Sequence, residues 1–169
     1  IADGDTAQQA VEELYRHGHR RIAALISRPN DQSISQLRYE GYVQALESHG
    51  IPVDPELVIC TGGFGAKDAY RAVQEKMAEN VDFTALFAIA DSMAIGAMRA
   101  LMDAGRRIPE DCSVIAIDGL ELSAYIEPPL TTLCQPMEEM GRRSAEILLD
   151  MVRHKGSHAC ELLPTTLRQ

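Results

Sequence analysis

The sequence predicts an α/β fold, a Rossmann-like parallel sheet flanked by helices on both faces. Short apolar runs without helical periodicity alternate with longer segments whose apolar residues recur every three or four positions. The connections are short, which is typical of βαβ crossovers and therefore of parallel strands. With 169 residues and an apolar share of 46%, the chain can bury the core of one layered domain.

Residues that start and stop helices mark the boundaries of these elements. Asp5 and Ser33 are each followed by Gln three residues later, which predicts helix caps, and Gly18 and Gly50 follow the first two helical patterns. The expected elements are, in order, helix 7–14, strand 22–26, helix 33–50, strand 57–60, helix 66–77, strand 85–89, helix 94–101, strand 114–117, strand 131–134, helix 137–153 and strand 161–167.

The composition argues against DNA binding by this chain and against a membrane span. Lys and Arg number 16 against 25 Asp and Glu, and the net charge of -9 has the wrong sign for neutralising phosphates. No stretch approaches the roughly 20 apolar residues of a membrane helix. The four cysteines form no C-x-x-C pair and no export signal is visible, so we expect reduced thiols in the cytoplasm.

The carboxyl ends of parallel strands share one edge of the sheet, and open α/β sheets bind ligands there. Arg38 could offer a hydrogen-bonding fork to a hydroxyl, carbonyl or carboxylate, and Asp118 could accept hydrogen bonds from hydroxyls or amines. Phe64, between glycines, could form an apolar wall. Asp91 directly precedes a helix, so capping is favoured over ligand contact. The segments expected at this edge are 28–38, 61–65, 90–91 and 118–121.

Each of the first three candidates also has an ordinary structural role. Arg38 could be a surface arginine paired with Glu40 or Glu47, an arrangement that contributes little free energy. Phe64 could be buried in the core. Asp118 could close an Asx turn at the end of its strand.

Catalytic and metal-binding motifs are missing. The sequence contains no G-x-S-x-G, no H-E-x-x-H and no glycine-rich phosphate loop. His154, His158 and Cys160 lie close together, but Gly156 ends the helix between the histidines, so we expect no metal there. We therefore predict a binding protein without a cofactor rather than an enzyme.

Four stretches closely resemble the effector-binding region of LacI/GalR transcriptional regulators. In order and spacing they cover essentially the whole chain. Members of that family have a helix-turn-helix domain, a hinge helix and two Rossmann-like subdomains, which three crossing strands join around the effector. The stretches are GHRRIAALIS, RYEGYVQALESHGI, TALFAIADSMAIGAMRALMDAGRRIPEDCSVIAIDG and PPLTTLCQPMEEMGRRSAEILL.

The resemblance implies a division of the chain. Residues 1–134 match the C-terminal effector-binding subdomain of the type I periplasmic-binding-protein fold, and 135–160 a crossing segment followed by a helix that packs on the N-terminal subdomain. Residues 161–169 match the return strand. The N-terminal subdomain and the DNA-binding domain would then lie outside this chain, which would supply only one wall of the effector cleft.

The resemblance also implies roles for individual residues. Arg38 matches the arginine that hydrogen-bonds effectors in the family, Phe64 the aromatic that lines the pocket, and Asp118 the acid that anchors the ligand. Gln135, on the crossing, matches a position that faces the cleft in some members. Ala90 stands where the family often has Asn.

We therefore expect a cytoplasmic sensor domain of a LacI-type repressor, which forms a homodimer and contacts DNA only through the missing N-terminal domain. Its effector, a sugar or similar metabolite, would change operator affinity. A periplasmic sugar-binding protein for transport is the alternative, because it shares this fold. The last long helix carries an apolar stripe expected to cause self-association when uncovered, formed by Met137, Met140, Leu148 and Met151.

Overall fold

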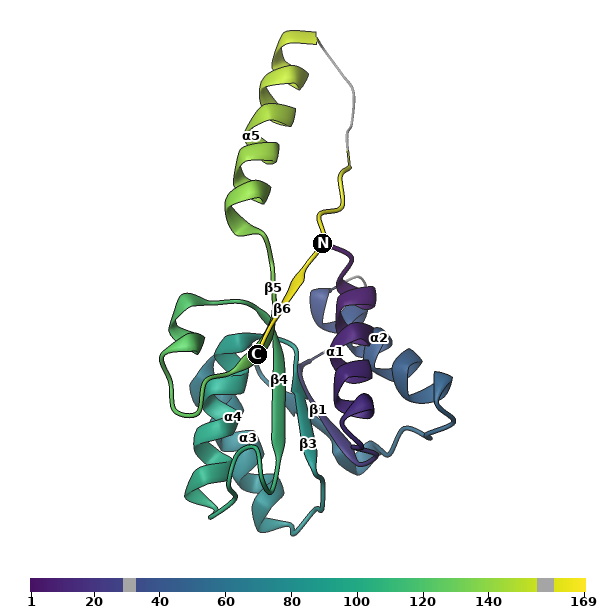
Figure 1. The fold of residues 1–169 in the computed structure, drawn as a ribbon, viewed down its shortest axis with the longest axis vertical. Helices are drawn as coiled ribbons and strands as arrows, with labels where there is room; N and C mark the ends of the chain where they lie inside the picture. Colours follow the sequence, from purple (N-terminus) through teal and green to yellow (C-terminus); the bar gives the residue numbers. More distant parts are fainter. Residues whose placement is uncertain (29–32, 155–159) are drawn as a thin grey trace.

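The computed structural model describes residues 1–28, 33–154 and 160–169, and confirms the expected α/β architecture (Figure 1). Six strands of the described chain form one sheet in the order β2-β1-β3-β4-β5-β6. The first five are parallel, and β6 pairs antiparallel with β5. The strands are β1 (Ile22–Ser27), β2 (Val58–Thr61), β3 (Ala85–Ala88), β4 (Ser113–Asp118), β5 (Thr131–Cys134) and β6 (Thr166–Arg168).

Helices α1 and α2 cover one face of the sheet, and α3 and α4 cover the other (Figure 1). The interior strands β1 and β3 are buried along their whole length because helices pack on both of their faces. Short 3-10 turns span Pro55–Leu57 and Glu121–Ala124. The helices are α1 (Asp3–Arg16), α2 (Ile34–Ser48), α3 (Ala66–Ala78), α4 (Asp91–Asp103) and α5 (Met137–His154).

The predicted ends of the elements are partly right. Ser33 caps α2 as expected, its hydroxyl accepting the amide of Gln36 at 3.1 Å. The capping role expected of Asp5 is wrong, because α1 begins earlier, with Ala2 at its N-cap and Asp5 inside the first turn. The last strand is shorter than expected, since only Thr166–Arg168 pairs with β5.

Two glycines allow neighbouring helices to approach closely. A Cβ added at Gly41 in α2 would lie 2.1 Å from the carbonyl oxygen of Gly4 in α1. A Cβ at Gly96 in α4 would lie 2.0 Å from the carbonyl oxygen of Ala66 in α3. Both helix pairs therefore pack backbone against backbone, which only glycine permits at these positions.

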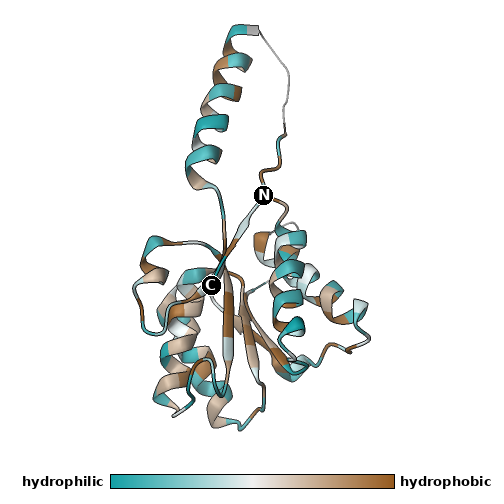
Figure 2. Cartoon of the chain, in the orientation of Figure 1, coloured by the Kyte–Doolittle hydropathy of each residue, from teal (hydrophilic) through white to brown (hydrophobic). Residues whose placement is uncertain are grey.

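The last helix stands apart from the rest of the molecule (Figure 1). We call residues 1–134 together with β6 the body, and α5 with residues 160–165 the arm. The arm leaves the body after β5, at the carboxyl edge of the sheet, where the N-terminus also lies. Apolar residues recur along α5 (Figure 2), and the side chains of Met137, Leu148 and Val152 are 55%, 62% and 71% exposed. No described helix is long and apolar enough to cross a membrane.

Candidate ligand-binding site

The sheet has a topological switch point between β1 and β3. The chain leaves β1 through α2 toward one edge of the sheet and leaves β3 through α4 toward the other. Open α/β sheets bind ligands beyond the carboxyl ends of the strands at such a point. Arg38 from α2, Asp118 at the end of β4 and Gln135 after β5 meet there.

Arg38 is a buried residue, with only 4% of its surface exposed. Its Nε donates to Asp3 Oδ1 at 2.8 Å, and its Nη1 donates to the carbonyl oxygen of Ile89 and to Asp118 Oδ1, the latter at 3.4 Å. The alternative role of Arg38, a surface arginine paired with Glu40 or Glu47, is therefore wrong. Three acceptors from three different elements fix the guanidinium, and its Nη2 makes no hydrogen bond with the described residues.

Asp118 leaves its strand in an unusual backbone conformation, with φ of 140°. Its Oδ1 accepts from Gln135 Nε2 at 2.7 Å, and its carbonyl accepts the Gln135 amide at 3.0 Å. The Asx-turn alternative is wrong, because the amides of Gly119 and Leu120 donate to Thr132 and Asp91 instead. The carboxylate is thus directed to the cluster formed with Arg38 and Gln135.

The electrostatic balance of this cluster is negative. One guanidinium, Arg38, faces the carboxylates of Asp3 and Asp118. Burial raises the pKa of Asp118, whereas the Arg38 charge and the hydrogen bond from Gln135 oppose that rise. Asp118 Oδ2 makes no hydrogen bond with the described residues, so the cluster offers an acceptor there and a donor at Arg38 Nη2.

Asp91 does not cap α4, contrary to expectation. The N-cap is Ala90, and Asp91 is the first helical residue, with none of its surface exposed. Its Oδ2 accepts from the Leu120 amide at 2.7 Å and from Ser123 Oγ at 2.9 Å, and its Oδ1 accepts from Thr132 Oγ1 at 2.5 Å. Both oxygens therefore serve the neighbouring loop and strand.

Phe64 lies on the loop before α3 and is 44% exposed. Its carbonyl oxygen accepts from Ser92 Oγ at 2.7 Å, which ties the loop to the start of α4. Burial in the core, the alternative role, is therefore wrong. The ring remains available as an apolar surface at the carboxyl edge, as the ligand-wall prediction requires.

Two charged residues of this region were not expected from the sequence. Asp3 precedes the apolar pattern of its helix, and only the packing of α1 on α2 brings its carboxylate to Arg38. Arg168, on β6, donates from Nη2 to the Leu120 carbonyl oxygen at 2.9 Å. Nothing in the sequence around Asp3 or Arg168 predicts these contacts.

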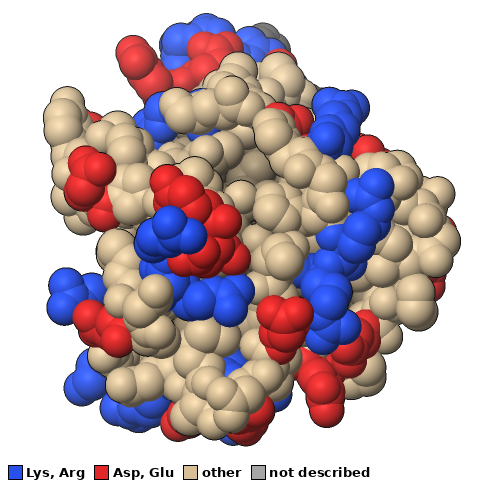
Figure 3. All heavy atoms as spheres, turned by 60° about the horizontal axis from the view of Figure 1, so that its bottom comes forward, with Lys and Arg blue, Asp and Glu red and all other residues tan. Residues whose placement is uncertain are grey.

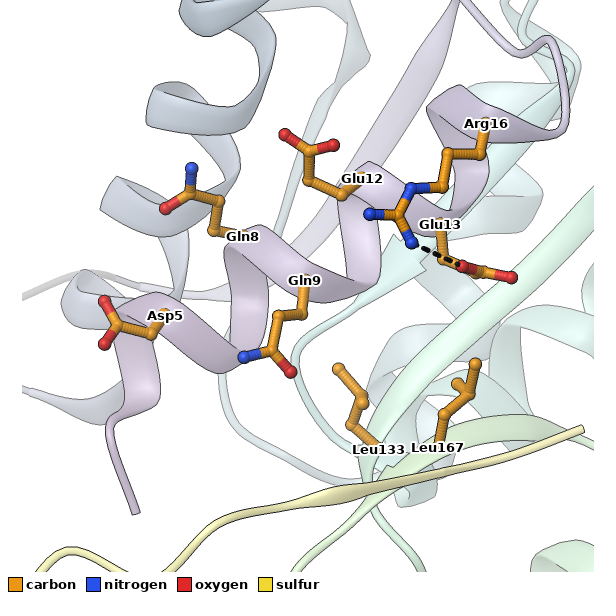
Figure 4. Close-up of a pocket in the computed structure, with 8 residues that line it drawn as sticks. All are labelled: Asp5, Gln8, Gln9, Glu12, Glu13, Arg16, Leu133 and Leu167. Atoms are coloured by element: carbon orange, nitrogen blue, oxygen red, sulfur yellow. Dashed lines mark ion pairs between the residues drawn. The ribbon is translucent and has the colours of Figure 1, made fainter.

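A groove of about 580 Å³ lies elsewhere, between α1 and the paired strands β5 and β6 (Figure 4). Carboxylates and amides of α1 line one side, Leu133 and Leu167 the other, and Arg16 pairs with Glu13 at 3.7 Å. None of the predicted ligand residues lines it. Among the described residues no group of three or more His, Cys, Asp or Glu could hold a metal ion; His158 and the side chain of His154 lie outside them.

A family model described as a periplasmic binding protein-like domain matches residues 11–169. The chain belongs to this family. It is similar to the HTH-type transcriptional repressor CytR of Escherichia coli strain K12, with 39% identity over 163 residues, covering 93% of this chain and 47% of the relative. It is also similar to the HTH-type transcriptional repressor PurR of Haemophilus influenzae strain PittEE, with 34% identity over 151 residues, covering 89% and 44% of the two chains.

Solved structures of transcriptional regulators are similar to this chain over essentially its whole length. The transcriptional regulator CelR in complex with cellobiose has a TM-score of 0.91 and 34% identity, covering 100% of this chain and 51% of that one. A LacI family regulator from Enterococcus faecium with bound ribose has a TM-score of 0.85 and 32% identity, covering 99% and 62%. The resemblance to LacI-type regulators is thereby confirmed. The chain spans about half the length of the curated relatives it matches.

Proposed function

We propose that this chain is the effector-binding region of a LacI-type transcriptional repressor and that its effector is a neutral, hydroxyl-rich small molecule. The observation that carries the proposal is the cluster of Arg38, Asp118 and Gln135 at the switch point of the sheet. A donor at Arg38 Nη2 and an acceptor at Asp118 Oδ2 suit adjacent hydroxyl groups of a sugar, and Phe64 offers an apolar surface for a sugar ring.

The charge of the cluster favours a neutral ligand over an anionic one. Asp3 and Asp118 already engage the guanidinium of Arg38, so it does not present an uncompensated positive charge. A phosphate or carboxylate would meet the Asp118 carboxylate in a partly buried setting, where repulsion is poorly screened. The relatives of known structure that hold cellobiose and ribose support the same class of ligand.

The regulator is favoured over the periplasmic transport protein because the curated relatives are repressors. On this proposal the protein acts in the cytoplasm, is not an enzyme, and contacts DNA through a part outside this chain. Figure 3 supports the last point, since acidic and basic side chains are interspersed on the face it shows, and the net charge is -9.

The division into a C-terminal subdomain at 1–134, a crossing segment and helix at 135–160 and a return strand at 161–169 is part of the proposal. It is supported by the arm, whose apolar face lacks a covering element within the described chain. A second subdomain packed on that face would complete the cleft. The proposed homodimer would use a different surface, and the exposed side chains of Leu122 and Tyr125 are suited to one.

Titration calorimetry on the regulator that contains this chain tests the ligand class. Cellobiose and ribose serve as neutral probes, with ribose 5-phosphate as the anionic match of ribose. We expect a neutral sugar to bind, and the phosphate to bind at least about tenfold more weakly because of the negative cluster. Tighter binding of ribose 5-phosphate, or no heat with any of the three, would count against the proposal.

Substitution of Asp118 tests the site itself. Asp118→Asn keeps the shape of the side chain but removes a charge-assisted acceptor, so sugar affinity should fall by about 1.5 to 3 kcal/mol. The control is Asp103→Asn on α4, which removes a carboxylate that pairs with Arg99 on the exposed surface. Unchanged affinity in Asp118→Asn would exclude Asp118 from the ligand contacts.

A further inference from the structure

A network of polar side chains lies behind the cluster, under the loop formed by residues 119–123. Asp91 accepts the Leu120 amide and the Ser123 hydroxyl on that loop, and Thr132 on β5 accepts the Gly119 amide at 3.3 Å. From the opposite side, Arg168 on β6 donates to the Leu120 carbonyl oxygen and to Ser123 Oγ. Two charged side chains from distant segments therefore hold one short loop.

The hydrogen bonds of the network at Ser123 Oγ are mutually compatible. Ser123 Oγ receives a hydrogen bond from Arg168, and its hydroxyl hydrogen is left to donate to Asp91 Oδ2 at 2.9 Å or to the Leu120 carbonyl oxygen at 2.7 Å. Ser123 thus joins the buried carboxylate of Asp91 to the guanidinium of Arg168 through hydrogen bonds. This compensates the charge of Asp91, which is fully buried.

The loop matters because Asp118 is the residue from which it starts. Asp118 adopts φ of 140°, and Gly119, at φ of 78°, packs so tightly that an added Cβ would lie 2.6 Å from Cys134. A conformation of this kind persists only where surrounding contacts impose it. The described contacts on the amides of Gly119 and Leu120 come from Thr132 and Asp91.

We propose that Asp91 and Arg168 are positioning residues of the ligand site, which fix the loop 119–123 so that the Asp118 carboxylate faces Arg38. Arg168 also connects the loop to the arm, because β6 continues directly from residues 160–165. The Nε of Arg168 is buried without a hydrogen-bond partner among the described residues, so the side chain is held here at a cost that its Nη2 contacts offset. The positioning of the loop does not depend on the proposed function. Only the expected effect on sugar binding rests on that function.

Hydrogen–deuterium exchange of the 169-residue chain tests the positioning directly. Arg168→Leu should raise exchange in the peptide covering 119–125 by at least about tenfold, the factor expected when a hydrogen bond to a charged group is lost. Exchange in β1 and β3 should not change. The control is Gln169→Ala, directly after the same strand, whose side chain instead donates to Glu13 at 3.2 Å. Unchanged exchange in Arg168→Leu, or the same increase in Gln169→Ala, would overturn the proposal.

Ser123→Ala provides a second variant should Arg168→Leu fail to fold. It removes the hydroxyl that joins Asp91 to Arg168 but leaves both charges in place, and it should give the same local increase. Labelling of Cys134 by a thiol reagent, resolved from the other cysteines by peptide mass, should also accelerate, because Gly119 packs against this side chain. A normal Cys134 rate in both variants would contradict a released loop.

The role in binding has its own readout. In the regulator that contains this chain, Arg168→Leu should weaken binding of the sugar probe, cellobiose or ribose, by several-fold at a temperature where the protein is still folded, and Arg168→Lys should restore part of it. A released loop with unchanged sugar affinity would show that the network is structural only. Failure of the wild type to bind either sugar would count against the proposed function instead, and the exchange data would still decide whether the loop is positioned.

Discussion

The body and the arm use amphipathic helices in opposite ways. In the body, the apolar faces of α1 and α4 are covered, and Ala10, Val11, Ala97 and Leu101 are at most 1% exposed. In the arm, α5 leaves Leu148 and Val152 mostly exposed. An apolar side chain left in water forgoes about 1.5 to 3 kcal/mol of burial free energy. The apolar faces of α1 and α4 are therefore covered within this chain, whereas the apolar face of α5 is not.

The largest expected effect comes from two glycines inside helices, one in each region. Gly96→Ala in α4 places a Cβ 2.0 Å from the Ala66 carbonyl oxygen, so we expect the body to lose about 3 kcal/mol of unfolding free energy. Gly141→Ala in α5 meets nothing within 4 Å and should instead gain up to about 1 kcal/mol of helix stability. Urea unfolding followed by circular dichroism measures both. Similar effects at the two positions would remove the distinction between body and arm.

The apolar stripe of α5 should cause self-association of the isolated chain. Met140→Glu combined with Leu148→Glu should weaken it at least about tenfold, because each charge would have to be buried in the contact. Sedimentation velocity at tens of micromolar measures the change. The control pair, Arg142→Gln with Arg153→Gln, lowers the net charge by the same two units on the other side of the helix. A wild-type monomer, or equal weakening by both pairs, would exclude the stripe as the contact.

The cysteines distinguish the two regions by their reactivity. Cys112 is buried in the body, and burial raises its pKa to about 12, so it should not react with a thiol reagent until the body unfolds. Cys160 in the arm is exposed and should react at once. Peptide mass mapping over time gives both rates. Labelling of Cys112 at the rate of Cys160 would mean that the body opens as readily as the arm.

The smallest effect is a pH dependence at the opposite edge of the body. His19 bonds to Thr84 Oγ1 and Ser113 Oγ, both at 3.0 Å, and its pKa is lowered by burial and then by His17. The unfolded chain therefore takes up the proton more readily, and body stability should decline as pH falls below the ordinary histidine value of 6.5. His19→Gln should reduce this slope. An identical slope in the variant would exclude His19 as its source.

Much of the body could be predicted because its signals are local. The alternation of apolar runs with helical periodicity gave the order of strands and helices, and Ser33 with Gln36 correctly marked the start of α2. Helix starts that lack such a signal were misplaced. The sequence predicts a cap at Asp5 because the apolar pattern begins at Ala7, whereas the helix starts with a polar turn at Asp3.

The candidate site could likewise be predicted only in part from local sequence. Sequence order predicted that Arg38 and Asp118 lie at one edge of the sheet, because parallel strands end on the same side. Whether a charged residue there is exposed, paired or buried depends on elements far away in the chain. The sequence is equally compatible with a surface ion pair for Arg38, whereas in the structure α1 and the end of β4 supply its partners.

By itself, then, the sequence determined the α/β class, the parallel strand pattern and the edge at which the candidate ligand residues collect, because local periodicity sets the order of strands and helices and parallel strands end on the same side. Tertiary structure alone decided that Asp3 holds Arg38 and that Asp91 and Arg168 hold the loop after Asp118. These contacts join residues that lie 29 to 48 positions apart in the sequence. A local pattern carries no information about such pairs, because their geometry is fixed only when the sheet and its helices pack.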